Sequence, residues 1–284
     1  MTSIVYIPPS QLLTPSYFSG TIPSLDRLRS LLILSGHGRI QRNSKVFNLS
    51  KDYLNIPIQA SGKFKVTKIV AKIPNCTSTE FRSLVSKAAT KNIRIHQNIY
   101  LELAHCIAQL EEKSYIASFV HLYRLIEHTA LYLPLVSIVS KGVNDLTFTD
   151  YKEIIDNKAK ADLSVLKKFS SKILNAEAAD STVNYSFSAT GNPSQNKKVA
   201  TEQLDADQIS NSGSDFFEIK MKNTDRLIVS FRNQFFHYLY HEKNISLKIL
   251  NDPDDFLSVC MPNFLNYFAF LYRELLIAEW ELWA

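Results

Sequence analysis

The pattern of hydrophobic and polar positions in the first third of the chain is mixed. Residues 3–7 are short and β-branched, and residues 64–71 alternate apolar with basic side chains, so both segments are expected to be strands. Residues 24–35 and 77–90 each begin with capping residues and are expected to be helices, the first ending at two nearby glycines. Together these elements predict a small α+β module over residues 1–91.

Helical periodicity replaces this mixture from residue 92 onward. Helices are predicted over residues 93–112, 115–133 and 149–174, with Pro134 expected to interrupt or kink the second of them. An apolar stripe at spacings of three and four residues supports the second helix, and it consists of Phe119, Leu122, Tyr123, Ile126 and Ala130. This part of the chain is expected to form a helical bundle.

A polar segment separates these helices from two further ones. Residues 176–214 are rich in Ser, Asn, Asp, Gln and Thr and have few large apolar side chains, which predicts a mobile polar insertion. A helix is expected to resume near Asp215 and to be strongest over 225–240, and a last helix begins at 252–255, where a proline and acidic residues favour a first turn. The fold class predicted is therefore mainly α, with the helical domain spanning residues 92–284.

Composition and cysteine usage agree with a folded protein of a reducing compartment. The chain has 284 residues, 45% of them hydrophobic and only 7 of them glycine, so it can bury a sizeable core and favours helices over a turn-rich β architecture. Cys76, Cys106 and Cys260 lie far apart without a CxxC pair, which indicates neither a disulfide framework nor a zinc knuckle.

The N-terminus has no basic region followed by a long apolar run, so we expect no signal peptide and a cytoplasmic protein. The most apolar segment, residues 256–283, contains several charged and amide side chains, which predicts a buried amphipathic helix and no membrane contact. The net charge of +5 permits an anionic partner, although no block of basic residues stands out.

The helix predicted over 225–240 carries the residues with the clearest chemical potential. Asn233, His237 and His241 recur at i, i+4 and i+8 and form a polar stripe beside an apolar face. Arg232 lies five residues before His237, about 140° around an α-helix, so the two side chains flank a site rather than stack. A second copy of the helix, related by a two-fold axis, would close such a site into one cleft.

The segment Arg232-Asn233-Gln234-Phe235-Phe236-His237 resembles the signature of HEPN ribonucleases, which are helical-bundle proteins of prokaryotic toxin–antitoxin and antiphage systems. The resemblance implies a homodimer that cuts RNA without a metal or other cofactor. A looser similarity covers residues 119–128, in which Tyr123, Arg124 and Glu127 look like residues of defence-related members. Together the two similarities cover residues 92–284 and leave the N-terminal module unexplained.

The chemistry that the resemblance implies suits these residue types. The imidazole of His237 titrates near neutrality and can move a proton at the ribose 2′-OH or the leaving 5′-oxygen. Arg232 can hold two phosphate oxygens, and Asn233 can orient His237 or the phosphate. Glu127 can fix Arg232 through a bidentate pair, with Arg124 and His241 as further supporting residues. The expected products carry a 2′,3′-cyclic phosphate and a 5′-OH.

Structural roles remain open for each of these residues. His237 and His241 can be histidines at the core edge, Arg232 can form an ion pair with Glu127, and Arg124 with Glu127 can be an intrahelical pair. A non-catalytic HEPN-like scaffold or subunit of a multi-protein complex explains the bundle equally well. An antitoxin or other regulatory protein is a further possible partner, and a DNA-binding module that uses residues 64–71 is a third reading.

Other reaction classes lack their usual motifs. The chain contains no GxxxxGK[ST] loop, no GxGxxG after a strand and no GxSxG elbow. His96, His105 and Cys106 occur at i, i+9 and i+10 of one predicted helix, a spacing that does not present them together as metal ligands. We therefore expect neither a metal site nor a cofactor.

Overall fold

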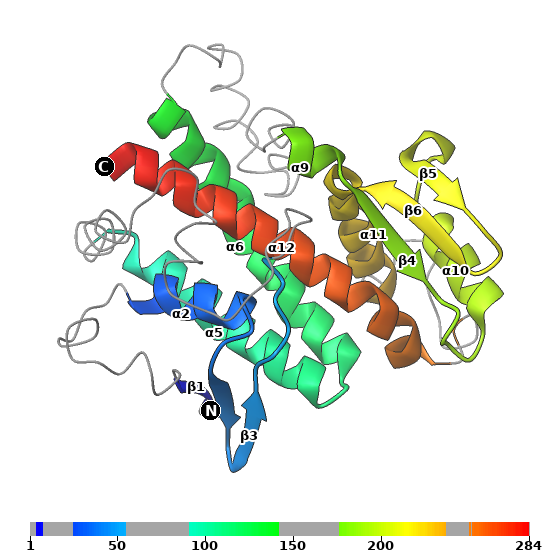
Figure 1. Ribbon diagram of the computed structural model, residues 1–284, viewed down its shortest axis with the longest axis horizontal. Coiled ribbons are helices and arrows are strands. Elements are labelled where there is room, and N and C mark those ends of the chain that lie inside the picture. Colours follow the sequence, from blue (N-terminus) through cyan, green and yellow to red (C-terminus); the bar gives the residue numbers. More distant parts are fainter. Residues whose placement is uncertain are drawn as a thin grey trace.

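Three long helices form the body of the protein (Figure 1). The computed structural model describes residues 4–7, 25–54, 91–141, 176–236, 250 and 252–283, and the structural statements below concern these residues. The helices are α5 (Ile93–Glu111), α6 (Tyr115–Lys141) and α12 (Pro253–Trp283), and α6 packs along both of the others. The prediction of a mainly helical protein with long helices here is confirmed.

A tight turn joins α5 to α6 and makes them antiparallel neighbours. Lys113 adopts a left-handed backbone conformation with φ of 58°, and the N–H of Ser114 donates to the carbonyl of Gln109 at 2.9 Å. This bond runs across six residues, as in a Schellman motif, and it satisfies a carbonyl that the helix end would leave without a partner. The turn fixes the register in which side chains of α5 face those of α6.

Helix α6 continues past the proline that was expected to interrupt or kink it. Pro134 lies inside the helix, which extends to Lys141. A proline removes one backbone hydrogen bond and crowds the preceding turn. Leu133 and Val136 are buried on either side of it, and packing of these apolar side chains offsets that cost.

The N-terminal elements fold onto this bundle rather than apart from it. Three strands, β1 (Ile4–Ile7), β2 (Arg39–Arg42) and β3 (Lys45–Asn48), form an antiparallel sheet in the order β1-β2-β3. Helix α2 (Leu25–Leu34) packs on α5, and the N–H of Tyr6 donates to the hydroxyl of Tyr100 at 3.1 Å. The first strand and helix are as predicted, whereas those expected over 64–71, 77–90 and 149–174 lie outside the described residues.

The prediction of a mobile polar loop over residues 176–214 is wrong, because this segment has regular secondary structure. It contains α9 (Ala176–Asp180), β4 (Thr182–Ser186), α10 (Pro193–Thr201) and β5 (Ile209–Ser212). The next segment, expected to be helical, is the strand β6 (Phe216–Lys220), and the three strands form an antiparallel sheet in the order β4-β6-β5.

Alternation of a few large side chains explains this second sheet. Val183 and Tyr185 of β4 and Phe217 and Ile219 of β6 are buried, while the residues between them are more exposed. The rings of Tyr185 and Phe217 stack at 5.0 Å, and Phe187 stacks on Phe256 of α12 at 5.6 Å. A small number of aromatic rings therefore buries enough apolar area to order a polar segment.

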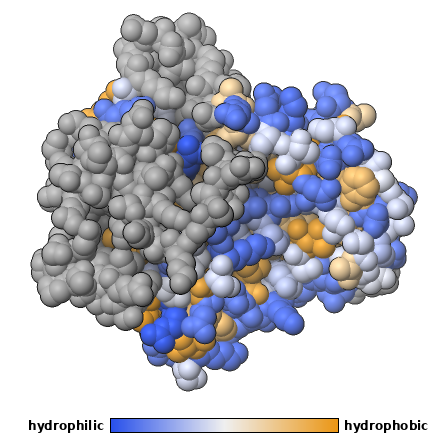
Figure 2. All heavy atoms as spheres, viewed as in Figure 1, coloured by the Kyte–Doolittle hydropathy of each residue, from blue (hydrophilic) through white to orange (hydrophobic). Residues whose placement is uncertain are grey.

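The second sheet leads directly into the helix that carries the predicted active site. After β6, the short 3₁₀ helix η6 (Met221–Asn223) precedes α11 (Thr224–Phe236), which lies beside the sheet at one end of α12 (Figure 1). In the view of Figure 2, the coloured surface over this unit is largely hydrophilic, and hydrophobic residues appear in small separate areas. The sheet thus fixes where α11 begins.

The turn after α2 requires glycine at position 38. Gly38 has φ of +93°, and a Cβ there would lie 2.6 Å from the Tyr6 hydroxyl and 2.7 Å from the Ile7 carbonyl oxygen. We expect Gly38→Ala to lower the free energy of unfolding by more than about 1 kcal/mol, measured by urea denaturation. Gly191→Ala is the control, because its nearest neighbouring atom would be 3.8 Å away. Equal stability of both variants would contradict this account of the turn.

Candidate functional site

Helix α11 presents a buried face to the bundle and a half-exposed face beside it. Leu227, Ile228 and Phe231 are fully buried, whereas Arg232 and Asn233 are partly exposed. The described part of the helix ends at Phe236. His237 and His241 therefore lie outside the described residues.

The guanidinium group of Arg232 is held against α6. Its central carbon lies 4.9 Å from the ring centroid of Tyr123, and its Nη1 donates to Asn233 Oδ1 at 3.0 Å. A cation over an aromatic face is stabilised by the ring quadrupole, and the planar guanidinium keeps a defined orientation there. Arg232 and Asn233 are thus brought together, and Tyr123 is a partner of Arg232 that the sequence reading did not assign.

Two charged residues follow Tyr123 closely on α6. Glu127 is one turn after Tyr123 and shares its face of the helix. Arg124 pairs with Glu102 of α5, with 3.4 Å between Nη1 and Oε1. Arg124 thus binds across to the neighbouring helix, and not to Glu127 as an intrahelical pair.

Aromatic packing anchors α11 to the bundle. Phe119 of α6 contacts the rings of Phe235 and Phe236, with centroids 6.4 and 6.3 Å apart. Phe231 packs on Phe256 and Phe264 of α12, at 5.2 and 5.9 Å. Interlocked rings of this kind have few alternative arrangements. They therefore fix the position of α11, and with it that of Arg232, relative to α6.

A second polar cluster lies where α5 faces α6. His121 Nδ1 is 2.6 Å from Glu102 Oε2, and the ring of His105 stacks on that of His121 with centroids 5.1 Å apart. Burial lowers the pKa of His105, and the nearby His121 and Arg42 lower it further while Glu102 opposes them. His105 is therefore largely neutral at pH 7.

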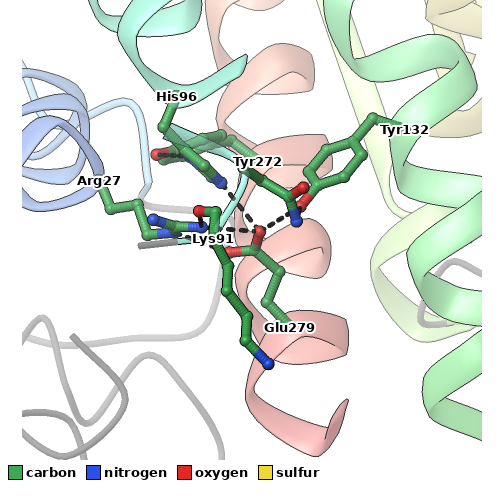
Figure 3. A network of polar contacts seen from close by, with 7 residues as sticks. Arg27, Lys91, His96, Tyr132, Tyr272 and Glu279 are labelled. Carbon is green, nitrogen blue, oxygen red and sulfur yellow. Dashed lines mark hydrogen bonds and ion pairs between the residues drawn. The ribbon is translucent and has the colours of Figure 1, made fainter. Parts of the chain in front are cut away.

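The deepest polar group joins four helices (Figure 3). Glu279 of α12 accepts hydrogen bonds from Arg27 of α2, at 2.9 Å from Nε and 3.1 Å from Nη2. His96 of α5 and Tyr132 of α6 also bind Glu279 Oε1, at 2.9 and 2.5 Å. Further bonds satisfy the outer atoms, with Arg27 donating to the Lys91 carbonyl and Asn92 donating to the Tyr132 hydroxyl.

This network is ionised at its centre and closed to solvent. Burial by itself raises the pKa of Glu279, but the hydrogen bonds from His96 and Arg27 and the positive charge of Arg27 outweigh it and lower the pKa to about 2. Burial lowers the pKa of His96, so its neutral ring donates through Nε2 to Glu279 and accepts through Nδ1 from the Tyr272 hydroxyl. Since Glu279, His96 and Arg27 are only 0–2% exposed, the network holds the fold together and presents no group to a substrate.

The three residues considered as metal ligands have separate partners. His96 belongs to the buried network, His105 stacks on His121, and Cys106 is buried beside Ser118. Within the described ranges, no group of three His, Cys, Asp or Glu side chains is arranged to hold a metal ion.

Comparisons with known proteins return no match, whether with family models, curated proteins or solved structures. Among the described helices, none is long and apolar enough to cross a membrane. The function must therefore be argued from the chemistry of the chain's own residues.

Neutralising Glu279 should have a large, pH-dependent effect on stability. We expect Glu279→Gln to lower the free energy of unfolding at pH 7 by about 3–5 kcal/mol, because Arg27 then remains buried without its counter-charge. The folded pKa lies below the ordinary value of 4.5, so the unfolded chain binds more protons between these pH values, and the stabilisation is complete above pH 4.5 and lost as pH falls towards 2. Urea denaturation from pH 7 to pH 3 measures both effects.

The matched control is Glu202→Gln, which changes an exposed glutamate whose oxygen lies 3.9 Å from Lys198 Nζ. We expect this variant to differ from the parent by less than about 0.5 kcal/mol. If Glu279→Gln kept the parent's stability and its acid dependence, the buried network would not be the source of either.

Proposed function

We propose that the protein is a metal-independent endoribonuclease of HEPN type that acts as a dimer. The observation that carries the proposal is the placement of Arg232, which α11 and the Tyr123 ring hold in a partly exposed position beside Asn233. A fixed, permanently charged guanidinium at the edge of a helical bundle suits a phosphodiester, because it can bind two non-bridging oxygens at once.

His237 supplies the proton chemistry in this proposal. It follows Asn233 by four residues in the sequence. The imidazole removes the proton from a ribose 2′-OH as the 2′-oxygen attacks phosphorus, and the bond from phosphorus to the 5′-oxygen breaks. The leaving 5′-oxygen receives a proton, so the products are a 2′,3′-cyclic phosphate and a 5′-OH, with Arg232 stabilising the charge that builds up on the phosphate.

A second copy of the chain completes the site. Arg232 and His237 lie about 140° apart on an ideal helix, so one copy of α11 does not direct both at one phosphorus atom. Phe236, beside His237 in the sequence, is 44% exposed. A large apolar side chain at this position supports a two-fold contact between α11 helices, in which each copy covers the other's phenylalanine.

The proposed biological role is antiphage defence or toxicity, with RNA as the substrate. A nuclease of this kind requires restraint, which an antitoxin or another regulatory protein would provide.

The second candidate function is that of a non-catalytic scaffold or subunit in a multi-protein defence complex. The observation in its favour is that Arg232 already has packing and hydrogen-bond partners within the chain, at Tyr123 and Asn233. The two functions differ in what happens to RNA, which the first experiment below measures.

Removal of either main residue should abolish RNA cleavage. Purified protein is incubated in EDTA with a labelled single-stranded RNA, and His237→Ala and Arg232→Ala are each expected to cut at least about 100-fold more slowly. The new 5′ ends should accept phosphate from a polynucleotide kinase directly, because they carry a hydroxyl group. Parental activity in both variants would remove this site from the reaction.

Arg226→Ala is the matched control. Arg226 lies on the same helix and is 37% exposed, and its Nη1 is 3.3 Å from Asp205 Oδ2. Its ion pair is thus with Asp205, whereas Arg232 packs on Tyr123. The Arg226→Ala variant loses the same positive charge from α11 but keeps Arg232 in place. Its cleavage rate should therefore stay within about two-fold of the parent. A loss equal to that of Arg232→Ala would mean that general charge, and not the placement of Arg232, is responsible.

The dimer should be required for cleavage. Light scattering after size exclusion is expected to give about twice the chain mass of 32.4 kDa, and the rate per chain should fall on dilution below the dissociation constant of the dimer. Phe236→Asp is expected to shift the protein to monomers and to reduce cleavage with it. Full activity from a monomeric Phe236→Asp protein would contradict the two-chain site.

A further inference from the structure

The polar cluster between α5 and α6 has no part in the site on α11 described so far. Glu102 and His105 of α5 and the residue that caps its end, Glu112, lie on one face at spacings of three and seven residues. His121 and Arg124 of α6 reach Glu102 from one side, and Arg42 of β2 reaches Glu112 from another at 2.6 Å. We call these residues the α5–α6 cluster, with Lys45 of β3 at its end, 3.1 Å from Glu112.

The histidine pair of this cluster has a defined orientation. The Glu102 carboxylate accepts from Nδ1–H of His121, so Nε2 of that ring is its acceptor nitrogen when the ring is neutral. The His105 ring lies nearly parallel to it, with an angle of 16° between the planes. Both side chains are partly exposed, so solvent and ions can reach them.

The charged groups of the cluster favour an anion. Three basic side chains face two carboxylates. Arg124 and Lys45 are 55% and 67% exposed, against 20% and 22% for Glu102 and Glu112, while Arg42 is 20% exposed. Pairs of this kind contribute little to stability, since water screens them and the side chains lose freedom. An arginine also has five N–H donors, so Arg124 can bind another anion while it remains near Glu102.

Helix α6 connects this cluster to the proposed active site. Tyr123, which holds Arg232, lies between His121 and Arg124 in the sequence. At about 100° per residue, the three side chains are spread over about 160° of the helix surface, with Arg124 in the middle, and they lie within about 4.5 Å along the axis. The exposed side of one turn of α6 therefore runs from the α11 site to the α5–α6 cluster.

We propose that the α5–α6 cluster binds phosphate groups of the single-stranded RNA that the α11 site cuts. The strand crosses the exposed side of α6, with one phosphate at Arg232 and neighbouring phosphates at Arg124, the histidine pair and Arg42. This proposal rests on the proposed ribonuclease function for its ligand. Binding by this cluster positions the RNA and includes no bond-breaking step.

The histidine pair makes the binding depend on pH. His105 faces His121 of α6, Glu102 of its own helix and Arg42 of β2, and its pKa is lowered chiefly by burial. A bound phosphate offsets the repulsion from the neighbouring positive charges and favours the protonated form of His105. Affinity for RNA should therefore rise as pH falls from 7.5 to 5.5.

The test measures binding separately from cleavage. A His237→Ala background is titrated with a fluorescent single-stranded RNA at several salt concentrations. Arg42→Gln with Arg124→Gln should weaken binding on the order of ten-fold and reduce the slope of log K against log salt by about 1.4, or 0.7 for each lost phosphate contact. Arg124→Gln alone, at a more exposed position that leaves the fold intact, should reduce the slope by about 0.7.

The control removes two positive charges that share one carboxylate elsewhere on the surface. Lys220 and Lys222 bind Asp180 at 3.2 and 2.7 Å, on the second sheet and the turn after it. Lys220→Gln with Lys222→Gln should leave RNA affinity within about two-fold of the background. Equal losses in the two double variants would overturn the proposal in favour of unspecific charge attraction, and no loss in either would overturn it outright.

The pH arm tests the histidine pair. The background should gain at least about five-fold in affinity from pH 7.5 to 5.5, and His105→Gln with His121→Gln should remove this gain. An unchanged gain would exclude the pair from the site. If the ribonuclease proposal fails, the parent protein and all variants lack cleavage, while RNA binding still weakens in Arg124→Gln. If the binding proposal fails, cleavage still depends on His237, while RNA binding is the same with and without Arg124→Gln.

Discussion

The burial of one ionised carboxylate constrains the whole arrangement of helices. Glu279 is fully buried, and a charge in such a position is stable only if several donors reach it. Arg27, His96 and Tyr132 provide these donors from α2, α5 and α6. Because each donor must stay within hydrogen-bond distance, none of these helices can slide along α12. The network therefore selects one register among the many that apolar packing alone permits.

The sequence was most informative where one pattern continued over many residues. The helices α5, α6 and α12 were predicted because their apolar spacing repeats over several turns. The second sheet was missed because its strands are four or five residues long and contain only one to three large apolar side chains each, among polar ones. Tyr185 and Phe217 belong together only after the chain has folded, since 32 positions separate them, and local composition does not reveal such a pair.

Prediction of the candidate site was similarly uneven. Arg232 and Asn233 were singled out from their motif, which remains a prediction of a site, and the structure adds that the guanidinium of Arg232 lies over the Tyr123 ring. The pair of Glu102 with His121 and the buried group around Glu279 were not found, because each depends on the register between two helices. That register follows from the Schellman turn at Lys113 and from long-range contacts, and neither leaves a periodic pattern in the sequence.

Burial separates the polar groups of this protein by their capacity for chemistry. The network at Glu279 is satisfied and sealed, so it can stabilise but cannot meet a ligand. His121 and Arg124 lie in the first half of α6, where Arg232 of α11 packs on Tyr123 and side chains are partly exposed. Tyr132, in the second half of α6, binds Glu279, and Asp254 accepts from the N–H of Ile116 at 2.8 Å near the start of the helix. Since the helix is held on both sides of residues 121–124, this turn can present its charges in a constant arrangement, as the proposed phosphate binding requires.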